Sequence, residues 1–71
     1  MDADLANDTF ASNLAAAAGR HGMTTTDLAR AASLPTSDVA RILDGTHRPC
    51  ARARQMLARA VGTTPEALAA P

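Results

Sequence analysis

At 71 residues the chain is close to the lower size limit of a single self-sufficient domain, and its one Cys excludes an internal disulfide. No stretch is long and apolar enough for a membrane span, and the acidic N-terminus lacks the features of a secretory signal, so a cytoplasmic protein without membrane contact is predicted. Seven arginines balance seven carboxylates, and this net charge of zero argues by itself against a nucleic-acid partner.

The charges are distributed unevenly along the sequence. Residues 1–8 hold three aspartates and no apolar period, which predicts a flexible acidic tail ahead of a single domain, 9–71. This domain carries seven arginines against four carboxylates, or +3. All its cations are arginine, which suits the recognition of phosphate or guanine, but an alanine-rich, lysine-free composition is equally typical of a GC-rich genome.

The first predicted helix follows this tail. We expect Asp8 or Thr9 as its N-cap, an end near Arg20 and a stop at Gly22. The residues expected on its buried face are Phe10, Leu14 and Ala17 or Ala18. Because the chain has one Phe and neither Trp nor Tyr, its core must be built mainly from aliphatic side chains.

The second predicted helix covers residues 25–32. Thr24 is its expected N-cap, and Asp27 in the first turn complements the helix dipole. Pro35 disfavours helical geometry at Leu34 and therefore breaks the chain after this helix. The residues expected in the core are Leu28, Ala29 and Ala32.

Three further helices are expected, and no strand pattern or repeat is present. The third runs from Thr36 or Ser37 to Leu43 and is ended by the Asp-Gly pair that follows. The fourth covers about 51–61, and the fifth begins after Thr64, which is followed by a proline at the first helical position. The expected core positions of the third and fourth helices are Val39, Ile42, Leu43, Ala53, Met56, Leu57, Ala60 and Val61.

A short helix, a three-residue turn and a second short helix make up a helix-turn-helix motif, whose second helix presents a polar face to the DNA major groove. From Gly22 to Gly45 the chain reads G-M-T-T-T-D-L-A-R-A-A-S-L-P-T-S-D-V-A-R-I-L-D-G. This stretch resembles, without a gap, the pattern G-L-T-Q-x-E-L-A-x-x-A-G-V-S-x-S-x-I-S-R-I-E-x-G of the Cro / lambda-repressor-like (Xre-type) family. LARAVGTTPEAL, 57–68, is similar to the family's I-A-x-A-L-G-V-S-x-x-x-L, so the resemblance covers about 10–68. It implies an all-α, compact five-helix lambda-repressor-like domain with its motif at about 24–45.

The chain departs from the family pattern at several positions. Thr25 replaces a phosphate-orienting Gln, and Ser33 replaces the turn Gly, so that a residue with a Cβ is expected at φ > 0. Pro35 replaces the Ser that caps the second motif helix, and Thr36 is expected to cap it instead. Asp38 places a carboxylate on the reading face, where phosphate repels it unless it accepts a hydrogen bond from a cytosine amine.

The residues predicted to contact DNA lie at the start of the first motif helix, on the outward face of the second and in the loop after it. They are Thr25, Thr26, Thr36, Ser37, Asp38, Arg41, Thr46, His47 and Arg48. Arg41 either reads a guanine or pairs with Asp27 on the neighbouring helix, and the sequence favours neither. Hydroxyls at helix N-termini attract phosphate but equally serve as plain N-caps. Phosphate contact is favoured for the loop residues 46–48, whereas the arginines within 51–61 are expected on a solvated face.

These features predict a sequence-specific double-stranded DNA-binding transcriptional regulator, a repressor of phage, plasmid or bacterial-operon type that reads the major groove with helix 36–44. A palindromic operator and a weak homodimer that forms on DNA are expected, because one short helix reads too few bases. The alternative is a protein-interaction module, antitoxin-like or anti-repressor, that keeps the fold with weakened DNA binding; the neutral charge and Asp38 favour it. No catalytic set is recognisable, and His21, His47 and Cys50 are too few for a tetrahedral zinc site, so neither enzyme activity nor a metal or cofactor is expected.

Overall fold

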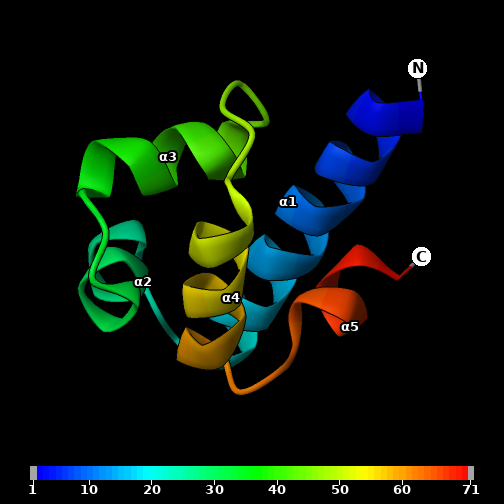
Figure 1. Ribbon diagram of the computed structural model, residues 1–71. Coiled ribbons are helices and arrows are strands. Elements are labelled where there is room, and N and C mark those ends of the chain that lie inside the picture. Colours follow the sequence, from blue (N-terminus) through cyan, green and yellow to red (C-terminus); the bar gives the residue numbers. More distant parts are fainter. Residues whose placement is uncertain (1, 71) are drawn as a thin grey trace.

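Short turns join five α-helices in the part of the chain that the structure describes (Figure 1). This computed structural model describes the backbone of residues 2–70 and the side chains of residues 9–70. The helices are α1 (Asp2–Arg20), α2 (Thr25–Ala32), α3 (Thr36–Asp44), α4 (Ala51–Ala60) and α5 (Pro65–Ala69). No strand occurs within residues 2–70, which confirms the all-α class. α2 has its predicted bounds, and the ends of α3 and α4 differ from the predicted ends by one residue.

α1 is the longest helix and begins earlier than the sequence predicted. It starts at Asp2 and runs through Asp8 and Thr9, so the predicted N-cap at either residue is wrong. A residue of the capping type marks a helix start only where the backbone before it is not helical. Helical backbone thus extends into the segment predicted as an acidic tail, while the side chains of residues 1–8 lie outside the described residues. The predicted end at Arg20 is confirmed.

An aliphatic core lies between the helices. Its largest fully buried side chains are Leu14, Leu28, Val39, Ile42 and Leu57. α2 packs on α3 and α4, and α1 packs on α3 and α5, so every helix contributes to this core. All positions predicted to face the core are buried or half-buried, which confirms the predicted inner faces of the first four helices.

Four helices, α1 to α4, end in the same hydrogen-bonded turn. In each, a residue at φ > 0 donates its N–H to the carbonyl three residues back, and the next N–H donates to the carbonyl five residues back. This pattern is the Schellman motif, in which the residue at φ > 0 is usually glycine. The four residues are Gly22, Ser33, Gly45 and Gly62. Within the described residues Ser33, at φ 58°, is the one non-glycine residue in this conformation, as the sequence predicted.

Side chains cap the starts of α2, α4 and α5. Thr24 and Asp27 exchange two hydrogen bonds of 3.1 Å between side chain and backbone, a complete capping box, and Thr64 caps α5. Both threonines were predicted as caps. Cys50 caps α4 through its Sγ, which accepts from the Ala53 N–H at 3.4 Å. Cysteine is not a typical N-cap, so this cap was not predicted, although the start of the helix near residue 51 was.

Two polar side chains join segments that are far apart in the sequence. The Asn13 Nδ2 group donates to the carbonyl of Leu68 at 2.7 Å and to that of Ala70 at 2.8 Å, which fixes the end of α5 on α1. The His21 Nε2 atom lies 3.1 Å from the Val61 carbonyl oxygen and joins the turn after α1 to the end of α4. Neither contact was predicted.

Candidate nucleic-acid interface

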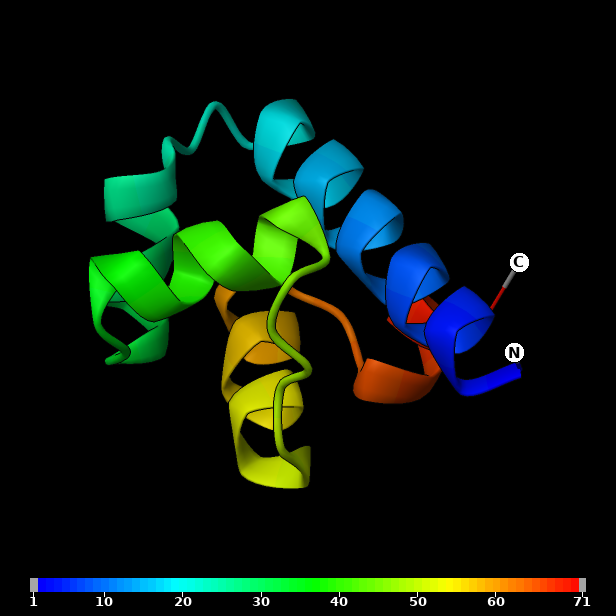
Figure 2. The same ribbon diagram turned by 90° about the horizontal axis from the view of Figure 1, so that it is seen from above.

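α2 and α3 pack against each other and are separated by three residues, 33–35. α3 lies across the top of the molecule in Figure 1 and faces the viewer in Figure 2, where the start of α2 lies beside it. The inner side of α3 is held by Val39 and Ile42, which are 0% and 2% exposed, and by the half-buried Leu43. Because this side is fixed in the core, the opposite side of α3 points to solvent in a defined orientation.

The predicted contact residues lie in three segments at this side of the molecule: the first turn of α2, the outward face of α3 and the loop after α3. The exposed ones are Thr26, Thr36, Ser37, Arg41, Thr46, His47 and Arg48. Thr25 and Asp38 are half-buried. Three of the four residues on α3 are therefore fully presented to solvent, and only the carboxylate-bearing one is partly covered.

The start of α3 differs from the other short helices because no side chain caps it. Its N-cap is Pro35, which has no side-chain acceptor, so the prediction that Thr36 caps the helix is wrong. Thr36 is instead the first residue with helical backbone. The Pro35 carbonyl accepts from the third and fourth N–H groups, but within the described residues the N–H groups of Thr36 and Ser37 have no acceptor. Two exposed backbone donors therefore stand beside two exposed hydroxyls, at the positive end of a helix dipole.

The proposed partner of Arg41, Asp27, is engaged within its own helix. The Asp27 carboxylate accepts from the Thr24 N–H at 3.1 Å, and this bond is the main reason why the pKa of Asp27 is lowered. The Thr24 hydroxyl lowers this pKa further; desolvation opposes it, and the charge of Arg30 has a smaller lowering effect. Within the described residues no ion pair joins Asp27 to Arg41, so the geometry favours an Arg41 side chain that is exposed on α3.

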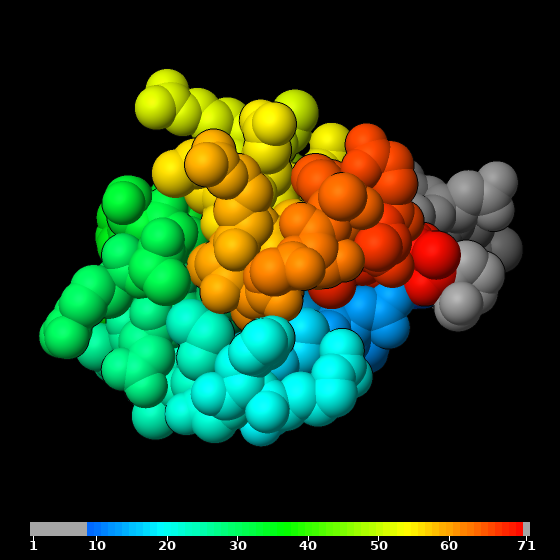
Figure 3. Space-filling view, turned by 90° about the horizontal axis from the view of Figure 1, so that it is seen from below, coloured from blue at the N-terminus to red at the C-terminus, as the bar shows by residue number. Residues whose placement is uncertain are grey.

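The loop after α3 is held at its start by the end of the helix. The Arg41 carbonyl accepts three hydrogen bonds, from the N–H groups of Thr46 at 3.0 Å and His47 at 3.2 Å and from the Thr46 hydroxyl at 3.2 Å. Figure 3 shows that this segment, in yellow-green, projects from the edge of the molecule beyond α4. The backbone of Arg41 thus positions the loop, while its side chain points to solvent.

The arginines of α4 lie on its surface, as the sequence predicted. Arg52, Arg54 and Arg59 are all exposed. Arg52 and Arg59 are seven residues apart and therefore share a face of the helix, whereas Arg54 lies on a different side. α3 itself carries two carboxylates, Asp38 and Asp44, against one arginine, so most of the positive charge lies outside α3.

Comparisons with known proteins give no assignment: no family model matches the chain, and no curated protein or solved structure is significantly similar to it. In the part of the chain that the structure describes, no group of three or more metal-binding side chains comes together. No described helix is long and apolar enough to cross a membrane. A function is therefore proposed from residues 22–45 and from where the structure places them.

Proposed function

We propose that the chain is a sequence-specific double-stranded DNA-binding regulator with a lambda-repressor-like (Xre-type) helix-turn-helix fold, which reads the major groove with α3. The observation that carries this proposal is the two-sided character of α3. Val39 and Ile42 fix one side in the core, while Thr36, Ser37 and Arg41 are exposed on the rest of the helix. A rigid helix with short polar side chains can approach base edges closely, which is what major-groove reading requires.

The groups on this surface match the chemistry of duplex DNA. The Arg41 guanidinium can donate two hydrogen bonds to O6 and N7 of a guanine. The open N–H groups and hydroxyls at the start of α3 suit a phosphate, because the helix dipole and the free donors both favour an anion there. Thr25, Thr26 and the loop residues 46–48 supply further donors for phosphate on either side.

One protomer reads too few base pairs for useful specificity. α3 has nine residues and is therefore about 13 Å long, which spans roughly four base pairs. We propose that two protomers bind a palindromic operator as a weak homodimer that forms on DNA, with half-sites about 10 base pairs apart. A chain that occupies a promoter in this way acts as a repressor, of the type found in phages, plasmids or bacterial operons.

The decisive experiment is selection of duplexes from a random pool, followed by salt-dependent titration of the selected site. Arg41→Ala is expected to lose about 1–3 kcal/mol of specific affinity and to relax the preference at one operator position. Arg48→Ala is expected to weaken binding to all DNA sequences alike and to reduce the slope of log affinity against log salt concentration by about one. Arg54→Ala, an exposed arginine on another helix, is the matched control and should bind like the parent.

Thermal melts of the same variants separate binding from folding. All three arginines are exposed, so their removal should leave the melting temperature nearly unchanged. Failure to enrich any duplex, with a folded parent protein, would overturn the proposal. The excess of carboxylates on α3 would then favour the second candidate, a protein-interaction module of antitoxin-like or anti-repressor type that keeps the fold.

A further inference from the structure

Asp38 on α3 carries a carboxylate that nothing in the described part of the molecule engages. The residue is half-buried at the third position of the helix. Within the described residues no hydrogen bond or ion pair reaches its carboxylate, and no side-chain oxygen without a partner is fully buried. The carboxylate is therefore open to solvent at the surface of α3. An ionised carboxylate accepts hydrogen bonds and has none to donate, so any group that replaces water there must be a donor.

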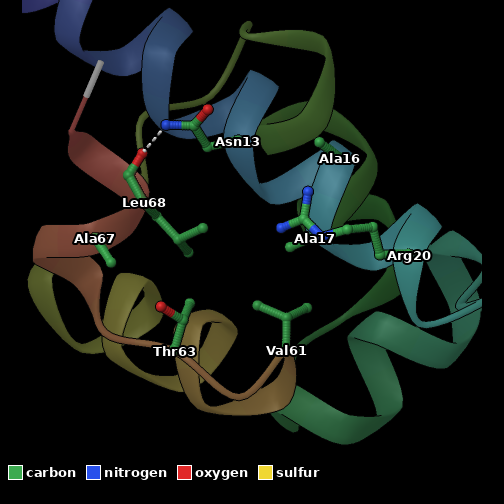
Figure 4. Close-up of a pocket in the computed structure, with 8 residues that line it drawn as sticks. All are labelled: Asn13, Ala16, Ala17, Arg20, Val61, Thr63, Ala67 and Leu68. Atoms are coloured by element: carbon green, nitrogen blue, oxygen red, sulfur yellow. Dashed lines mark hydrogen bonds between the residues drawn. The ribbon is translucent and has the colours of Figure 1, made fainter.

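The backbone that carries Asp38 is held in place by the helices behind it. The next residue, Val39, is 0% exposed, and Ile42 one turn further on is 2% exposed. α1 packs against α3 and is itself tied to α5. Figure 4 shows this tie beside the hollow between α1 and α5, where the Asn13 Nδ2 group donates to the Leu68 carbonyl at 2.7 Å. α3 therefore presents its surface residues in a fixed arrangement.

Asp38 and Arg41 are neighbours on the surface of this helix. They are three residues apart, which places them about 4.5 Å apart along the helix axis. Within the described residues no ion pair joins them. Successive base pairs of duplex DNA are about 3.4 Å apart, close to this spacing. If Arg41 donates to a guanine as proposed, Asp38 faces the next base pair.

The four bases differ in what they offer a carboxylate in the major groove. Guanine presents two acceptors, N7 and O6, and thymine presents the acceptor O4 and a methyl group. Adenine presents the donor N6 beside the acceptor N7. Cytosine alone presents a donor, its N4 amine, with no acceptor on its own edge. A carboxylate is repelled by acceptors, so cytosine is the base that it accepts best.

We infer that Asp38 selects a cytosine at the operator position next to the guanine that Arg41 reads. The carboxylate accepts a hydrogen bond from the cytosine N4 amine and repels the acceptors of the other bases. This inference rests on the proposed function, because it requires α3 in the major groove. It gives a role to a charge that weakens the attraction of α3 to phosphate: Asp38 lowers the affinity for all other sequences more than for the operator.

The test compares two substitutions that each remove one negative charge from α3, Asp38→Asn and Asp44→Asn. Asp44 is exposed at the last position of the helix and is the matched control. Duplexes are selected from a random pool with the parent and with each variant, and Arg41→Ala identifies the guanine position. The parent should select cytosine next to this guanine. Asp38→Asn should select adenine there, because an amide accepts from N6 and donates to N7. Asp44→Asn should keep the cytosine and bind all sequences more tightly.

Titrations of duplexes that differ at this one position measure the effect. The parent should bind the cytosine duplex about tenfold more tightly than each of the others, and Asp38→Asn should lose this preference. Thermal melts confirm that each variant is folded. They also detect the structural alternative, in which Asp38 only complements the dipole of α3 and its loss lowers Tm without changing the base preference.

Three results would overturn the inference while the proposed function stands. The parent could select a specific site without cytosine next to the guanine, or the two asparagine variants could tighten binding alike with unchanged base preference. Asp38→Asn could also relax the choice of guanine instead of its neighbour, which would show that Asp38 acts through Arg41. A folded parent that selects no duplex would overturn the proposed function and this inference with it.

Discussion

Ser33 occupies the turn between the two helices of the motif in a conformation that favours glycine. Its backbone lies at φ 58° and ψ 41°, and its N–H and that of Leu34 make the two bonds that end α2. Replacing Ser33 by glycine removes the contact between a Cβ and the backbone but leaves both hydrogen bonds in place. We expect Ser33→Gly to stabilise the fold.

The magnitude follows from two opposing terms. The left-handed conformation destabilises the folded state by about 1–2 kcal/mol for a non-glycine residue, and Ser33→Gly removes this strain. The greater freedom of glycine in the unfolded chain offsets about 0.4–1 kcal/mol of that stabilisation. The net stabilisation is then about 0.5–1 kcal/mol. For a domain of this size each 1 kcal/mol raises Tm by about 4–8 °C, so Tm should rise by about 2–8 °C.

Thermal and urea unfolding followed by circular dichroism measures both quantities. The control is Gly62→Ser, because Gly62 occupies the same position of the same motif after α4, at φ 74°, with no atom within 4 Å of an added Cβ. That substitution should lose about as much stability as Ser33→Gly gains, with equal denaturant dependence in all three proteins. A neutral or destabilising Ser33→Gly, together with a neutral Gly62→Ser, would refute the reasoning that backbone strain at this turn limits stability.

Three further predictions concern the core, the pH dependence and the acidic segment. Leu28→Ala should lower the free energy of unfolding by about 2–5 kcal/mol, since Leu28 is 0% exposed. A decrease of less than about 1 kcal/mol in urea titrations would contradict its central place in the core. Asp27 has a lowered pKa because the Thr24 N–H donates to it, so its contribution to folding stability is present above about pH 4 and is lost as the pH falls through the pKa of the folded state. In melting curves, the difference in Tm between the parent and Asp27→Asn should therefore shrink on acidification, and a constant difference would contradict this. If the chain binds DNA as proposed, changing the three aspartates within 1–8 to asparagine should tighten binding at low salt, and unchanged affinity in gel shifts would exclude a repulsive effect.

Local sequence signals predicted most of the motif because the interactions that define it are local. The bond from Thr24 to Asp27 spans three residues, and the helix-ending turns span five, so a short window of sequence contains both partners. The helical period likewise fixed which side of α3 is outward once Val39 and Ile42 were assigned to the core. The exposure of Arg41 was therefore predictable, although its choice between Asp27 and solvent depended on tertiary geometry.

Contacts between distant segments could not be predicted in this way. Asn13 and Leu68 are 55 positions apart, and an asparagine on a helix surface has no local feature that identifies its acceptor. The start of α1 was misplaced for a different reason, because Asp8 and Thr9 are good capping residues that the structure uses inside a helix.

The net charge of α3 is negative, which sets the kind of DNA binding that the proposed function predicts. Two carboxylates outnumber the single Arg41 on this helix, so its direct attraction to the phosphate backbone is small. Each phosphate that a protomer neutralises adds about 0.9 to the salt slope. Arg48 is the one arginine of α3 and its following loop that is assigned to phosphate, so it gives a slope of only about 1 per protomer. Binding to random sequence should therefore be weak at physiological salt. If the chain binds DNA as proposed, this weak non-specific background makes its residence on DNA depend on hydrogen bonds to bases at the operator and on the second protomer, both of which are lost together when the sequence is wrong.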